Sequence, residues 1–177
     1  MWLHVAGELL LTTSCAWAVV AALRHRSVLA ALGFALIGIA ALLGALNYAG
    51  VPDTAAPHDT ATFLAARLGL LMVAAKALID MRRALFIALA CAVALLVPET
   101  AALAISALAL VAICWKGRSV RWPLAIVGAA LFALAGLLIG TRGEWLQIPR
   151  VDLYHFTLAI AILVWIAAGV AVKARRA

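Results

Sequence analysis

Long apolar runs recur along this chain of 177 residues, and they limit what it can fold into more than any other feature. A helix needs about 20 mostly apolar residues to cross the hydrocarbon core of a bilayer. Hydrophobic residues make up 68% of the chain and charged residues 12%, more apolar surface than a soluble domain can bury. The sequence therefore predicts an all-α, polytopic transmembrane helix bundle, with residues 1–177 forming one transmembrane domain.

The breaks between the apolar runs predict the number of helices. Seven short helices are expected, at residues 3–23, 28–50, 61–80, 84–97, 101–115, 122–140 and 153–172. The stretch from Ala84 to Trp115 is too long for one span, and Pro98 followed by Glu99 favours a turn in its middle. The alternative is six spans, in which this stretch forms one long tilted helix.

The basic residues predict how the bundle is oriented. Lys and Arg residues gather in cytoplasmic loops of membrane proteins. With seven spans and the N-terminus outside, 11 of the 14 Lys and Arg residues fall on the cytoplasmic side. We therefore expect a multi-pass protein of a bacterial inner (plasma) membrane, with a cytoplasmic C-terminus. The net charge of +7 is explained by these small loop clusters, so no nucleic-acid partner is expected.

The first and last expected helices each carry one imidazole and one carboxylate near the outer side. His4 and Glu8 are four residues apart, and Asp152 and His155 are three apart, so each pair shares one helix face. If the two helices are neighbours, the four side chains converge as a candidate site for zinc or another divalent metal. The alternative is two interfacial histidines, with Asp152 capping the last helix in front of Leu153.

Arg67 lies within the third expected helix, about 10 Å below the outer surface at a rise of about 1.5 Å per residue. A charge at that depth costs several kcal/mol unless it is paired or hydrated. Glu8 is the expected partner and Glu99 the second choice, while Asn47 either joins them or caps the second helix. Arg67, Glu99 and Asn47 thus form a candidate buried polar network; the alternative is an arginine that snorkels to the interface.

The helix layout resembles that of small bacterial seven-helix membrane proteins that are similar to the superfamily of alkaline ceramidases and adiponectin-receptor-like proteins. The stretch Leu43–Gly50 resembles the early helix on which those proteins place a histidine, and Asp152–His155 resembles the start of their last helix. The resemblance implies zinc-dependent hydrolysis of a lipid amide. Asn47 and Ala159 stand where further histidines of that family are expected.

Two functions follow from these residues. The first is a metal-assisted lipid hydrolase-like protein, or a degenerate relative of one, with a lipid-like substrate. The second is a non-enzymatic membrane protein: a subunit of a larger membrane complex, or a binder of lipid, quinone or haem. In the haem version, His4 and His155 are the axial ligands.

Overall fold

The computed structural model describes residues 2–76, 81–116 and 121–170, and it is helical apart from one small two-stranded sheet. Four helices in these ranges are long and apolar enough to cross a membrane: Trp2–Arg24, Val28–Tyr48, Trp122–Ile139 and Arg150–Ala168. The prediction of an all-helical protein with the character of a membrane bundle is therefore confirmed.

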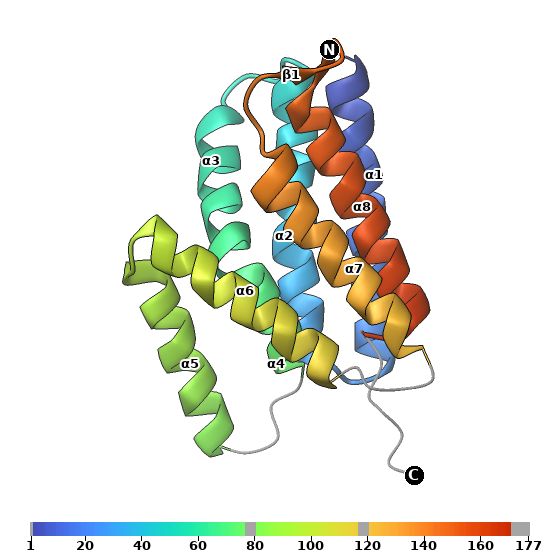
Figure 1. Cartoon of the computed structure of the whole chain (residues 1–177). Coiled ribbons are helices and arrows are strands. Elements are labelled where there is room, and N and C mark those ends of the chain that lie inside the picture. The colour runs from blue at the N-terminus through green and yellow to red at the C-terminus, as the bar shows by residue number, and fades with distance from the viewer. Residues whose placement is uncertain (1, 77–80, 117–120, 171–177) are drawn as a thin grey trace.

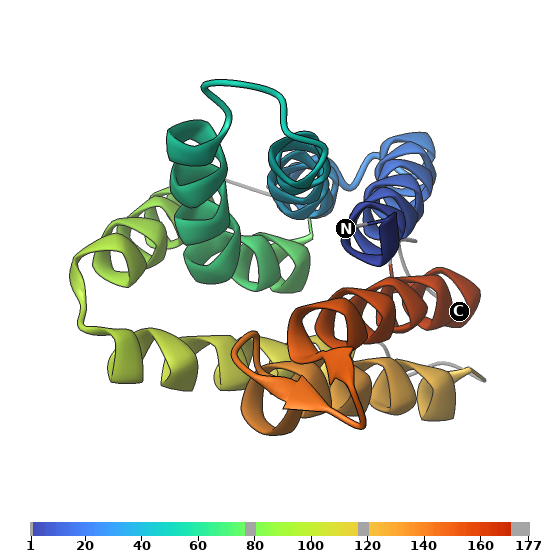
Figure 2. The same ribbon diagram turned by 90° about the horizontal axis from the view of Figure 1, so that it is seen from above.

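The four long helices form the main body of the bundle. They are α1 (Trp2–Arg24), α2 (Val28–Tyr48), α7 (Trp122–Leu134), which continues as the π-helical turn η2 (Ala135–Ile139), and α8 (Arg150–Ala168). α1 packs against both α2 and α8, and α8 packs in turn against α7. Figure 2 shows this arrangement from above, with the first and last long helices side by side. The first and last long helices are therefore neighbours.

The third helical segment begins earlier than the sequence predicts. It consists of α3 (Ala55–Leu64), the π-helical turn η1 (Ala65–Gly69) and α4 (Leu70–Ala75). The expected span was 61–80, of which residues 77–80 lie outside the described ranges. The first turns of α3 are polar and were assigned to a loop, although Pro57 is well suited to the start of a helix.

The break predicted at Pro98 is confirmed. α5 (Met81–Leu96) ends just before it, and α6 (Glu99–Lys116) begins just after it. Their apolar stretches, Ala84–Leu96 and Glu99–Trp115, are shorter than the four candidate spans. α5 packs mainly against η1 and α6, and α6 crosses the bundle obliquely in front of α2 (Figure 1). This pair is thus attached to the side of the main body.

A two-residue hairpin, β1 (Glu144–Trp145) and β2 (Ile148–Pro149), precedes α8 in a segment that the sequence analysis treated as a plain loop. Leu146 and Gln147 between the strands have φ angles of +53° and +65°, as a type I′ turn requires. The hairpin ends directly at Arg150, where α8 starts. It therefore sets the position of the first turn of α8, which carries Asp152.

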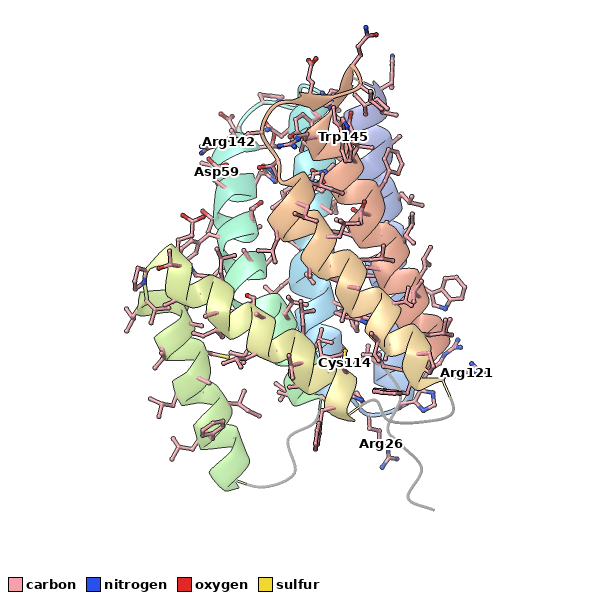
Figure 3. All side chains as sticks on the ribbon, in the orientation of Figure 1. Arg26, Asp59, Cys114, Arg121, Arg142 and Trp145 are labelled. Carbon is pink, nitrogen blue, oxygen red and sulfur yellow. The ribbon has the colours of Figure 1, made fainter. Side chains whose placement is uncertain are left out.

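The two ends of the bundle differ in their charged residues. Asp59, Arg142 and Trp145 lie at one end, which we call the upper end, and Arg26 and Arg121 lie at the other, the lower end (Figure 3). These two groups are thus separated along the length of the bundle (Figure 3).

Apolar packing near the lower end fixes α7 against α8. The indole of Trp165 fills the space beside Gly128, where an added Cβ would lie 2.3 Å from the ring. Its Nε1 donates a hydrogen bond of 3.1 Å to the carbonyl oxygen of Ala125, and its ring stacks on Phe132. A buried indole with a satisfied N–H is a stable anchor. This contact holds the helices whose upper turns form the candidate site.

Candidate functional site

The four residues at the two ends of the chain are brought together at the upper end of the bundle. Because α1 packs directly on α8, His4 Nδ1 forms a hydrogen bond with Asp152 Oδ1. One turn further along, Glu8 Oε1 lies 3.5 Å from His155 Nδ1 without a hydrogen bond between them. The two helices thus contribute two imidazole–carboxylate pairs, one above the other.

Glu8 is buried without a hydrogen-bond partner among the described residues. Its side chain is 1% exposed, and neither carboxylate oxygen has a hydrogen-bond partner among the described residues. The carboxylate lies against the backbone of α2 at Gly44, where an added Cβ would be 2.2 Å from Oε1. Only glycine leaves this space. The carboxylate is therefore placed by a gap in the facing helix rather than by hydrogen bonds.

Asp152 does not cap α8, contrary to the alternative considered from the sequence. α8 starts at Arg150, with Pro149 at the cap position, because the preceding hairpin ends there and the helix begins three residues earlier than expected. Asp152 lies inside the first turn, where the helix dipole favours a negative charge. Its Oδ1 is bonded to His4, whereas Oδ2 has no partner among the described residues.

His58 on α3 is a site residue that the sequence analysis missed, because it placed His58 in a loop. Its Nδ1 lies 3.1 Å from the carbonyl oxygen of Ala40. A carbonyl oxygen only accepts, so Nδ1 donates, and Nε2 of the neutral ring is left as an acceptor. Its Cε1 would lie 3.0 Å from a Cβ at Gly44, the same point that the Glu8 carboxylate approaches. His58 therefore approaches Glu8 from a third helix.

A cavity of about 260 Å³ begins at these side chains and runs into the bundle. Its polar end is formed by Glu8, His58, Tyr154 and His155, and most of the remaining wall is apolar. The turns η1 and η2 line it from opposite sides. π-helical turns are rare and occur often at functional sites. A small apolar cavity that ends in a few convergent polar groups has the form of a ligand-binding site.

Arg67 is not paired with Glu8, and that prediction is wrong. Its Nη1 donates to the carbonyl oxygens of Ala94, Leu95 and Val97, at 2.8, 3.3 and 2.6 Å. The last carbonyls of a helix have no partner within that helix, so they attract a cation. Its guanidinium also lies 4.6 Å from the ring centre of Phe63. Arg67 thus fastens the end of α5 to η1.

The remaining members of the predicted polar network are separate. Glu99 lines a second cavity of about 250 Å³ together with Arg67, but no ion pair joins the two in the part of the chain that is described. Asn47 lies in the last turn of α2, where its backbone carbonyl oxygen accepts a 3.0 Å hydrogen bond from the backbone N–H of Gly50. Capping of α2 by the Asn47 side chain stays a prediction.

Within the described residues, no three His, Cys, Asp or Glu side chains are grouped as the ligands of a metal ion. Comparison of the chain with protein-family models, curated proteins and solved structures gives no match. The resemblance to the alkaline ceramidase superfamily stays a prediction, and the function is argued below from the geometry of Glu8, His58 and His155.

Proposed function

We propose that this chain is a membrane-embedded, hydrolase-like protein in which Glu8, His58 and His155 hold zinc or another divalent metal beside a lipid-like substrate. One observation carries the proposal: a fully buried carboxylate without a hydrogen-bond partner lies near two imidazoles at the polar end of an apolar cavity. Such a carboxylate is unfavourable in apolar surroundings unless a cation or a donor meets it.

The donor set fits a divalent metal. One carboxylate and two imidazoles are the ligands of a common type of catalytic zinc site, which keeps a further position open. Glu8 and His155 have unpartnered buried atoms, and the Nε2 of His58 is left as an acceptor by the bond to Ala40. Since these side chains are not yet grouped as ligands, binding would draw them together. A bound ion would supply a Lewis acid that polarises a carbonyl and activates water.

The residues of the chain have distinct roles in this proposal. Asp152 and His4 bond to each other across α1 and α8, so they hold these helices in register rather than completing the ligand set. The four-residue ligand set expected from the sequence is therefore revised: His4 and Asp152 leave it, and His58 joins Glu8 and His155. Gly44 leaves the space in which the Glu8 carboxylate lies. The apolar wall of the rest of the cavity would keep water away from the hydrocarbon chain of a lipid-like substrate.

We place the site at the outer face of a bacterial inner membrane. Arg26 and Arg121 lie at the lower end, which supports a cytoplasmic lower end with the N-terminus outside and seven spans (Figure 3). α5 and α6 would be the two short spans in this arrangement.

Metal analysis of the purified full-length protein after incubation with zinc and removal of the excess tests the proposal. We expect about one zinc per chain in the wild type, and loss of zinc in Glu8→Gln and His155→Ala, because a single metal has one carboxylate and at most two imidazoles here. His25→Ala, in the turn after α1, is the matched control and should keep its zinc. A wild type without zinc, or variants that retain it, would reject the metal site.

A non-enzymatic binder of lipid or quinone is the second candidate, because the cavity wall is mostly apolar. Binding without turnover in zinc-loaded protein would favour it. We do not extend the proposal to haem, since His4 and His155 lie on directly packed helices and each faces a carboxylate. A Soret band in the absorbance spectrum of the purified protein would restore the haem alternative.

A further inference from the structure

We infer that the cavity opens sideways into the bilayer and takes one apolar chain of a single-chain amphiphile, whose uncharged, hydrogen-bond-donating head group meets Glu8. The inference rests on the proposed function only in that the chain spans a membrane and that this cavity is its ligand site. It adds the route of access, the number of apolar chains and the chemistry of the head group.

The cavity has one closed wall and one open side. The wall towards α1, α2 and α8 is buried; it includes Glu8, Leu11, Ala41 and Leu158. The side between α3, α6 and η2 consists of exposed residues: Thr62, Ala66, Leu103, Ala107, Gly136 and Leu137. We call these six residues the side mouth.

The side mouth faces the region that lipid would occupy. η2 is the last part of the candidate span Trp122–Ile139, so the mouth lies along the flank of a membrane helix rather than in a loop. Leu137 is 72% exposed, and a Cβ added at Gly136 would meet nothing within 4 Å. In Figure 1, α3 and α7 stand on either side of this region and α6 crosses beneath it. A ligand dissolved in the bilayer can therefore enter without passing through water.

The cavity extends along the third helical segment, and its small volume favours one apolar chain. Its lining follows the third helical segment from His58 to Leu70, a length of about 18 Å at about 1.5 Å per residue. Its volume of about 260 Å³ is smaller than the roughly 300–1,000 Å³ that is usual for small-molecule sites. So small a volume spread over that length leaves room for a single acyl or alkyl chain.

The polar end selects the head group. In the metal-free protein, Glu8 offers two oxygens without a hydrogen-bond partner and His58 offers Nε2, so the polar end presents acceptors that need donors. Among the described residues, no Lys or Arg lines the cavity, and nearby Arg67 is bonded to carbonyls at the end of α5 and just after it. An anionic head group would meet a carboxylate without a counter-charge. Hydroxyl or amide N–H groups would satisfy the acceptors.

The test uses full-length protein treated with a chelator, so that the head-group preference reports Glu8 and not a bound metal. Native mass spectrometry from detergent counts bound monoolein, which has one chain and two hydroxyls, oleate, which is anionic, and dioleoylglycerol, which has two chains. We expect one monoolein per wild-type chain, and apparent affinities for oleate and dioleoylglycerol that are at least about tenfold weaker.

Two tryptophan variants test the side mouth. Gly136→Trp fills the open space at the mouth and should weaken monoolein binding at least about tenfold. The matched control is Leu138→Trp, at an exposed position of the same turn that does not line the cavity, and its binding should stay within about twofold of the wild type. Ala107→Trp, on the α6 side of the mouth, repeats the block if Gly136→Trp fails to fold.

Each outcome decides a separate part of the inference. Wild-type binding in Gly136→Trp or Ala107→Trp would overturn the side mouth, and equal binding of oleate or dioleoylglycerol would overturn the ligand class. A wild type that binds no monoolein would overturn both. Monoolein binding by a protein that takes up no zinc and hydrolyses nothing would leave this inference standing and reject the metal-dependent function proposed above.

Discussion

Arg67 and Glu8 are both ionisable residues within the helical bundle, yet only Arg67 is satisfied by the fold. The Arg67 guanidinium donates hydrogen bonds to three backbone carbonyl oxygens at the end of α5 and in the turn after it. The Glu8 carboxylate has no hydrogen-bond partner in the described part of the chain. In the sequence, the depth of Arg67 in the membrane made it a candidate member of a buried polar network. The two residues differ in their hydrogen-bond partners, and this difference supports a structural role for Arg67 and the ligand-binding role proposed for Glu8.

The comparison predicts opposite effects on stability, and this is the largest effect expected. Arg67→Met removes the cation and leaves the carbonyls of α5 without a donor, so we expect a loss of about 3 kcal/mol in the free energy of unfolding. Glu8→Gln removes an unpartnered buried carboxylate and should be neutral or stabilising by about 1 kcal/mol. SDS titration in mixed micelles measures both.

Arg142→Met serves as the control for the loss of one positive charge, because Arg142 is exposed in the segment before β1. It should change the unfolding free energy by less than about 0.5 kcal/mol. If Glu8→Gln destabilised the protein as much as Arg67→Met, the distinction between the two residues would be lost.

The second prediction asks whether Glu8 is placed by the gap at Gly44. In Gly44→Ala the added Cβ would lie 2.2 Å from Glu8 Oε1, the end of a flexible side chain that can turn away. We expect a stability loss of only about 1 kcal/mol, but a zinc affinity at least about tenfold weaker. Gly136→Ala is the control, because its Cβ would enter open space. Unchanged zinc binding in Gly44→Ala, measured by competition with a chelating dye, would show that Gly44 does not position the carboxylate.

Much of the fold could be predicted from the sequence because bilayer length and helix periodicity act locally. The apolar runs gave the four long helices, and Pro98 gave the break between α5 and α6. The spacing within each of the pairs His4/Glu8 and Asp152/His155 was enough to predict two polar faces, and the structure places these faces together.

The parts that the sequence analysis missed depend on backbone geometry that an apolar run does not reveal. His58 was not recognised as a site residue because α3 begins in a polar stretch, before the apolar run that marked the expected start of the helix. The hairpin with its type I′ turn at Leu146 and Gln147 makes α8 start earlier in the sequence than expected. Asp152 therefore lies inside the helix and bonds to His4 instead of capping the helix. The partners of Arg67 are backbone carbonyls, and a search for charged side chains could not find them.

Asp152 lies between the two extremes, since one of its oxygens is satisfied by His4 and the other has no partner among the described residues. Because the His4 side chain is 24% exposed, water competes for this bond, and we expect the smallest effect here.

A double-mutant cycle of His4→Phe and Asp152→Leu should give a coupling free energy of about 1 kcal/mol. The control cycle pairs His4→Phe with Thr157→Val, whose hydroxyl bonds within α8, and should give a coupling below about 0.5 kcal/mol. A His4–Asp152 coupling above about 3 kcal/mol would mean that this pair is as firmly built into the fold as Arg67. A coupling near zero would instead group Asp152 with Glu8, as a carboxylate left available for a ligand.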